Sequence, residues 1–243
     1  AIERIYSLKI LERSANYVII SILIILTGLY SVGTIKRNYI WRDGYTLWAD
    51  TVKKSPDGHI PHIHIGDAYY QKGELDKAVE HYQTALKLRP EVALVHHNLG
   101  NAYSALGKFD EAIKEYTITI KLKSDYPEAA HINLGNLYFA LGKFDEAVKE
   151  YMVAIKLKPN FPEAHYNLGN TYSEKGEIDK AIEHYQIALR LKPDYLDAHY
   201  NLGFVYLEMG LKHKAEEEFK TALQLSPDFT PAREALESIN RER

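Results

Sequence analysis

The chain has 243 residues, 46% of them apolar, and a formal net charge of −3, so it is long enough to bury a large core. It contains no cysteine, which excludes a disulfide framework and a thiolate metal site. Residues 59–243 carry 22 Lys or Arg and 28 Asp or Glu, and this acidic balance without a basic stripe argues against a nucleic-acid partner.

The N-terminal part contains one long apolar run. Residues 1–13 form a mixed-charge amphipathic segment that flanks it, and because the chain begins with Ala1 rather than methionine we expect a fragment or a processed form. From Ser14 to Ile35, 22 residues carry no charge, which is long enough to span a bilayer. The alternative is a buried helix of a soluble protein, but such helices rarely stay uncharged on every face. We therefore predict a transmembrane helix over 14–35 and a membrane location.

Residues 36–58 connect this run to the remainder of the chain. Trp48 and Thr51 stand at the distances before Pro56 that an aromatic and a small residue show before each later proline. We therefore expect a juxtamembrane half-repeat that joins the membrane helix stiffly to the C-terminal part. Counting Lys and Arg on the two sides of residues 14–35 weakly favours a cytoplasmic position for the C-terminal part.

A repeated pattern occupies residues 59–231. Its first glycine recurs at intervals of 34, 35, 34 and 34 residues, at Gly66, Gly100, Gly135, Gly169 and Gly203. Sixteen residues after each glycine stands an aromatic residue: Tyr82, Tyr116, Tyr151, Tyr185 or Phe219. A fixed period of this length is typical of a solenoid built from one supersecondary unit. The units are predicted over 59–92, 93–126, 127–161, 162–195 and 196–229.

Each unit contains two runs of apolar residues at helical spacing. In the fourth unit, Gly176 separates the runs, Asp179 opens the second one and Pro193 closes it. Each unit is therefore predicted to be an antiparallel helix pair that buries its apolar face by stacking on its neighbours. The third unit has one extra residue, and we expect a local adjustment where its first helix starts. Residues 231–243 are predicted to form a capping helix over the last unit.

These residues resemble the tetratricopeptide repeat. The resemblance covers residues 59–231 and implies an all-α superhelical solenoid of antiparallel helix pairs, here preceded by one transmembrane helix. The junction, with Arg37-Asn38, Trp41, Leu47-Trp48 and Pro56, also resembles transmembrane, tetratricopeptide-containing O-mannosyltransferase-like proteins. That second resemblance implies repeats on the extracytoplasmic side of the membrane, contrary to the charge count, and we adopt it as the expectation.

Asparagines recur on the first helix of the units, two residues before and one residue after the glycine. A carboxamide offers both a donor and an acceptor, which suits contact with the backbone of an extended peptide. The row is similar to the asparagine ladder in the repeats of O-linked N-acetylglucosamine transferase, which implies peptide binding; the alternative is that these amides only bond neighbouring helices. The predicted peptide-binding residues are Asn98, Asn101, Asn133, Asn136, Asn167, Asn170 and Asn201, with Tyr166 and Tyr200 as side-chain pockets ringed by acidic residues.

The sequence offers no sign of catalysis. It shows no nucleophile–base pair, phosphate loop or paired carboxylates, so we expect no catalytic residue, no metal and no cofactor in this segment. One histidine recurs four residues before each glycine, but ligands to one metal ion must lie about 2 Å from it, and histidines a repeat apart are too distant. We expect these histidines to pack between helices.

The sequence thus predicts a membrane-anchored protein-interaction module whose partner is an extended polypeptide. We expect it to be the substrate-recognition end of a multi-pass glycosyltransferase-like protein. The alternative is a single-span scaffold that organises a cell-envelope or secretion complex. A homodimer formed through the end faces is a third alternative, which no feature of the sequence indicates.

Overall fold

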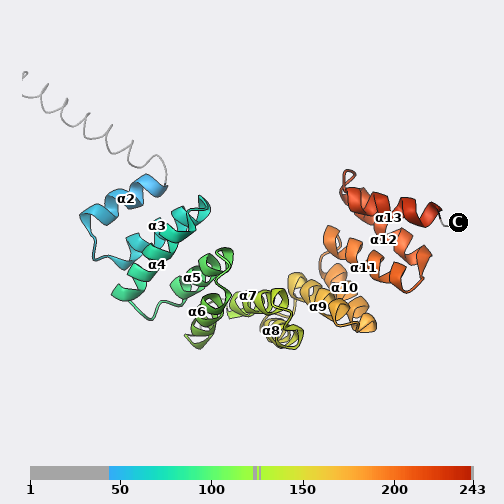
Figure 1. Ribbon diagram of the computed structural model, residues 1–243, viewed down its shortest axis with the longest axis horizontal. Coiled ribbons are helices and arrows are strands. Elements are labelled where there is room, and N and C mark those ends of the chain that lie inside the picture. The colour runs from blue at the N-terminus through green and yellow to red at the C-terminus, as the bar shows by residue number, and fades with distance from the viewer. Residues whose placement is uncertain (1–43, 123–124, 126, 242–243) are drawn as a thin grey trace, which may run out of the picture. The chain divides into compact units, whose positions relative to one another are not determined.

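The computed structural model describes residues 44–122, 125 and 127–241 (Figure 1). Every regular element within these ranges is a helix, and they form two compact units, one up to Leu88 and one from Arg89. The predicted flanking segment 1–13 and membrane helix 14–35 lie outside the described residues. No described helix is both long and apolar enough to cross a membrane.

The first compact unit contains α2 (Gly44–Lys54), α3 (His59–Gln71) and α4 (Leu75–Leu88). Helix α2 packs against α3, and the ring of Trp48 stacks on His64 with centroids 4.2 Å apart. The hydroxyls of Tyr45 and Tyr69 lie 3.1 Å apart across the same contact. Residues 44–54 therefore pack on the first helix pair in the way that a second repeat helix does.

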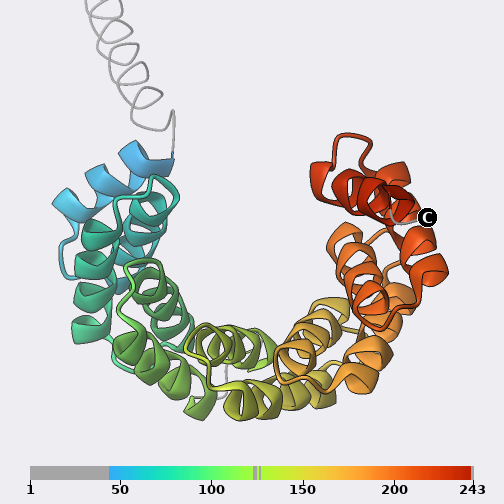
Figure 2. The same cartoon turned by 45° about the vertical axis from the view of Figure 1, so that its right-hand side comes forward.

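The second compact unit contains four helix pairs, which correspond to four repeats, and a final helix. Its helices are α5 (Ala93–Ala105), α6 (Phe109–Lys121), α7 (Pro127–Ala140), α8 (Phe144–Leu157), α9 (Pro162–Glu174), α10 (Ile178–Leu191), α11 (Leu196–Glu208), α12 (Lys212–Leu225) and α13 (Thr230–Arg241). Within each pair only three residues separate the helices, so the two run antiparallel. The second helix of each pair packs on the first helix of the next, and the first helices contact one another in series (Figure 2).

The predicted all-α repeat fold is confirmed, and the irregular unit shows how an extra residue is accommodated. Helix α7 has 14 residues, whereas α5, α9 and α11 have 13 each. Gly135 accordingly lies one place further from its helix start than the other first-helix glycines. The insertion is absorbed at the start of α7, so the contacts around Gly135 keep the geometry of the other pairs.

A glycine on the first helix lets the two helices of a pair approach closely. In the pair α9/α10, a Cβ on Gly169 would lie 2.6 Å from Cδ1 and Cε1 of Tyr185. Tyr185 is only 2% exposed, so its ring fills the space that the glycine leaves. Gly176 ends the first helix with a φ of +73°, a left-handed conformation that a residue with a side chain adopts only with strain.

The last element, α13, begins at Thr230, one residue before the predicted start of the cap. Ala232 and Ile239 are buried on it, and Ala235 and Leu236 are partly buried against the same core. Its opposite face carries the charged side chains of Arg233, Glu234 and Glu237. The helix therefore covers the apolar face that α12 would otherwise expose.

Candidate functional site

On the second helices α4, α6, α8 and α10, a tyrosine holds a polar side chain on the first helix of its pair. The Tyr185 hydroxyl donates to Asn170 Oδ1 at 2.7 Å, and Tyr151 donates to Asn136 Oδ1 at the same distance. Tyr116 donates to Asn101 Oδ1 at 2.6 Å. Because burial raises the pKa of Tyr185 above its ordinary value, its hydroxyl stays protonated and available as a donor.

The same amide oxygens accept a second hydrogen bond from the next repeat. Asn201 Nδ2 donates to Asn170 Oδ1 at 2.9 Å, and Asn167 Nδ2 donates to Asn136 Oδ1 at 3.0 Å. Asn133 Nδ2 repeats the contact with Asn101 Oδ1 at 2.9 Å. These hydrogen bonds join successive repeats across the face that the first helices form. We call this set the asparagine row: Asn101, Asn133, Asn136, Asn167, Asn170 and Asn201.

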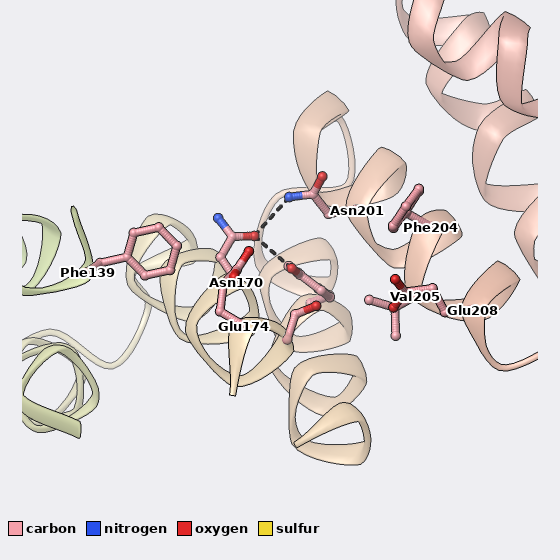
Figure 3. A pocket seen from close by; sticks show the side chains of 9 residues that line it. Phe139, Asn170, Glu174, Asn201, Phe204, Val205 and Glu208 are labelled. Carbon is pink, nitrogen blue, oxygen red and sulfur yellow. Dashed lines mark hydrogen bonds between the residues drawn. The ribbon is translucent and has the colours of Figure 1, made fainter. Parts of the chain in front are cut away.

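The direction of the tyrosine bond follows from the first unit. There the equivalent acceptor is Asp67, which receives the Tyr82 hydroxyl at 2.7 Å, and an ionised carboxylate can only accept. With Oδ1 of Asn136 and Asn170 held by two donors, the amide nitrogen lies on the other side of the carboxamide. Figure 3 shows this for Asn170, whose nitrogen points away from Asn201 on the side where Phe139 lies. Asn136 is exposed, and its Nδ2 has no hydrogen-bond partner among the described residues.

The fifth unit departs from this arrangement at both positions together. Phe204 replaces the asparagine and Phe219 replaces the tyrosine, so an acceptor and its donor are lost as a pair. Phe219 is fully buried, and a hydroxyl there would have no acceptor at residue 204. The paired change supports the view that the tyrosine hydroxyl is kept in the other repeats because the first helix offers it an acceptor.

Two cavities open beside the asparagine row. The larger, about 480 Å³, is lined by Phe139, Asn170, Ser173, Glu174, Tyr185, Asn201, Phe204, Val205 and Glu208. In Figure 3, Phe139 of α7 and Phe204 of α11 lie on opposite sides, with Asn170 and Glu174 of α9 between them. The smaller, about 290 Å³, is lined by Asn136, Phe139, Tyr151, Asn167 and Asn170. Four of the predicted asparagines, Asn136, Asn167, Asn170 and Asn201, thus line these cavities together with Phe139 and Phe204, which the sequence did not single out as site residues.

The two tyrosines predicted as pockets lie among packed side chains. The Tyr166 ring lies 4.9 Å from that of Tyr195, and its hydroxyl accepts a hydrogen bond from Asn201 at 3.1 Å. Tyr200 contacts Phe219 and Phe229 with ring centroids 5.8 and 5.3 Å away. Neither tyrosine lines the two cavities, because both rings are drawn into the core. Asn98, the remaining predicted asparagine, holds on α5 the place that Asn133, Asn167 and Asn201 hold on the later first helices, and it is engaged in an interaction.

The recurring histidines lie between the two helices of a pair, which agrees with the packing expected of them. His96 Nδ1 donates to Glu115 at 2.5 Å, whereas His165 Nδ1 lies 3.1 Å from His184 Nδ1. Burial alone lowers the pKa of His96, but Glu115 and the carbonyl of Pro90 raise it overall. Burial, with the charges of His184 and Arg190, lowers the pKa of His165 to about 4. Over the described ranges, no three His, Cys, Asp or Glu side chains gather as metal ligands.

Comparison with known proteins agrees with this architecture. The model of the TPR repeat matches residues 66–107, 100–142, 135–176 and 169–210, and that of the tetratricopeptide repeat matches 196–229. No curated protein matches the chain.

Solved structures of similar fold cover most of the chain. A crystal structure of MamA, 31% identical, covers 67% of this chain and 95% of its own with a TM-score of 0.62. YrrB, a TPR protein with an unusual peptide-binding site, is 23% identical and covers 77% of this chain and 96% of its own, also with a TM-score of 0.62. A thermophilic TPR protein of Thermus thermophilus is 22% identical and covers 76% of this chain and 100% of its own, with a TM-score of 0.59. Because the family models span more than half of the residues, the chain belongs to the tetratricopeptide-repeat family.

Proposed function

We propose that the second compact unit, from Arg89 onward, binds a polypeptide in extended conformation along the asparagine row. The observation that carries this proposal is the fixed orientation of Asn136 and Asn170. Their oxygens are held by a tyrosine and by the next repeat, which leaves the amide nitrogens as donors on the open side. Donors at a regular interval suit the carbonyl groups of a peptide backbone whatever its side chains.

The neighbouring cavities support the same proposal. They are lined by residues of three successive first helices, so a ligand lying along the row meets α7, α9 and α11 in turn. Phe204, 47% exposed, offers apolar contact beside the amides. The peptide-binding site for which YrrB is described supports this use of a repeat of this kind.

The test replaces Asn136 and Asn170 by aspartate in the full chain. Aspartate keeps the oxygen that accepts from the tyrosine, as Asp67 does in the first unit, but it removes the open-side donor. The probe is a library of short, unstructured peptides without charged residues, so that the added carboxylates do not attract it. Two lost hydrogen bonds of about 1 kcal/mol each predict at least a ten-fold loss of affinity.

The controls separate recognition from folding. Circular dichroism in urea should give the Asn136→Asp/Asn170→Asp chain nearly the stability of the parent. Alanine at Asn133, Asn167 and Asn201 is less informative, because it also removes hydrogen bonds that join the repeats. If the doubly substituted chain captures the peptides as well as the parent does, the amide nitrogens are not the recognition groups.

We also propose that residues 14–35 tether this module to a membrane with the repeats on the extracytoplasmic side. The uncharged run of 22 residues and the junction from Arg37 to Pro56, similar to that of O-mannosyltransferase-like membrane proteins, support this placement. Leu23→Arg with Leu26→Arg should release the chain from membranes into alkaline carbonate, since each arginine costs about 2.5–3.5 kcal/mol at the bilayer centre. Protection of the repeats from protease in sealed vesicles checks the orientation.

A further inference from the structure

We propose that the larger cavity, between α9 and α11, receives an arginine side chain of the bound peptide. This inference rests on the proposed peptide binding and names the side chain that the groove selects. The cavity of about 480 Å³ lies beside Asn170 and Asn201, so a side chain from a peptide on the asparagine row reaches it directly.

Two carboxylates in this cavity occupy electrostatically unfavourable places. Glu174 is the last residue of α9 and Glu208 is the last residue of α11. The C-terminal end of a helix carries partial negative charge, and neither helix has a basic residue in its last turn. The equivalent places in the other three repeats carry Gln71, Ala105 and Ala140, which are neutral. Of the three repeats that line the cavity, those of α9 and α11 thus carry a negative charge at this place, and that of α7 does not.

These charges have no cation to compensate them within the described part of the chain. Neither Glu174 nor Glu208 forms an ion pair, and the nearby Lys175 is held by Asp145 and Glu177. Both carboxylates act on the cavity itself, because after burial and the charge of Tyr166 they help to raise the pKa of the Tyr185 hydroxyl. A cation that enters the cavity therefore meets two carboxylates that no described cation neutralises.

The aromatic side chains favour arginine over lysine. Phe204 stands where the other units carry Asp or Asn, and Phe139 faces the cavity from the other side (Figure 3). A planar guanidinium stacks on aromatic rings and is less strongly hydrated than an ammonium group. Its five N–H donors also allow simultaneous hydrogen bonds to two carboxylates.

The experiment measures the affinity of the full chain for four labelled peptides by fluorescence anisotropy. The peptides share one Ala/Ser/Thr sequence and differ at a single central residue: arginine, citrulline, lysine or leucine. Citrulline keeps the shape of arginine without its charge. We expect the arginine peptide to bind about ten-fold more tightly than the citrulline peptide, which corresponds to about 1.4 kcal/mol. The lysine peptide should fall between them.

A pair of variants assigns this preference to the cavity. Glu174→Gln with Glu208→Gln should bring the arginine-to-citrulline ratio close to one. Glu111→Gln with Glu146→Gln changes the net charge equally at exposed sites outside the cavity, and should leave the ratio unchanged. The cavity variant should also be at least as resistant to urea as the parent, since it removes negative charge from two helix C-termini, so weaker binding cannot be attributed to unfolding.

The outcomes separate this inference from the proposed function. If the parent binds all four peptides equally, or if the cavity variant keeps the preference, the cavity does not select arginine although the groove still binds peptide. If none of the four peptides binds, the groove itself does not recognise extended chains, and both proposals fall together.

Discussion

Gly169→Ala tests whether the approach of the two helices in a pair depends on a missing side chain. In an unconstrained helix, alanine stabilises relative to glycine by about 0.8–1 kcal/mol. Here the new Cβ would lie 2.6 Å from two ring carbons of Tyr185, whereas ordinary contact begins at 3.4 Å. The ring cannot turn aside freely, because it is 2% exposed and its hydroxyl is bound to Asn170.

The expected result is a net loss of stability. Overpacking a close-packed site typically costs about 1–3 kcal/mol, which exceeds the gain in helix propensity. After the gain of about 0.8–1 kcal/mol is subtracted, we expect Gly169→Ala to lower the free energy of unfolding by up to about 2 kcal/mol. The assay is urea unfolding of the full chain followed by circular dichroism. Ser104→Ala, at a partly buried position of the first helix α5, serves as the propensity control.

A double-mutant cycle identifies the cause of the loss. Tyr185→Leu removes the ring atoms that the new Cβ meets, so Gly169→Ala should cost at least about 1 kcal/mol less in that background. A stabilising Gly169→Ala, or an equal cost in both backgrounds, would refute the reasoning.

Two further predictions concern the positions where the repeats differ from one another. Phe219→Tyr alone should destabilise the chain by roughly 1 kcal/mol because residue 204 offers no acceptor, and adding Phe204→Asn should recover that loss in urea unfolding; an additive double variant would contradict the pairing. His184→Glu should make the chain more resistant to urea at pH 5 than the parent, with a difference that shrinks by pH 8. The pKa of His165, lowered to about 4, makes the parent lose stability as the pH falls from 6.5 towards 4, because the unfolded chain binds the proton first. The pKa of His96 is raised opposite Glu115, so protonation of that histidine stabilises the fold instead. At the His165–His184 pair, the other charges that act are Glu183 and Arg190. Parallel pH profiles for parent and variant would show that the His165–His184 contact does not control this dependence.

The fold was predictable because every repeat has the same small and aromatic residues at the same spacing and therefore packs in the same way. The glycine period located each helix pair, and the extra residue of the third unit was expected at the start of its first helix, where α7 is longer. The second glycines were expected to end the first helices, and Gly176 does so with a positive φ.

The candidate site was predictable only as far as the spacing of its asparagines. The position of Asn170 on its helix follows from the period, but which of its amide atoms faces outward depends on Tyr185 and Asn201, which come from two other helices. The joint loss of asparagine and tyrosine at Phe204 and Phe219 was the available signal for this bond. The cavities combine three repeats, so Phe139 had no reason to stand out in any single unit.

The hydrogen bond from Asn201 to Asn170, and its equivalents in the preceding repeats, also bears on how such a protein changes in evolution. Each of these junctions uses an asparagine Nδ2 as donor and an asparagine Oδ1 as acceptor. A regular repeat that is duplicated therefore carries both groups with it, and after a deletion the two flanking repeats still match. The binding surface can thereby lengthen or shorten by whole repeats without inventing a new interface. The Phe204–Phe219 pair marks where that modular series stops and the terminal helix takes over.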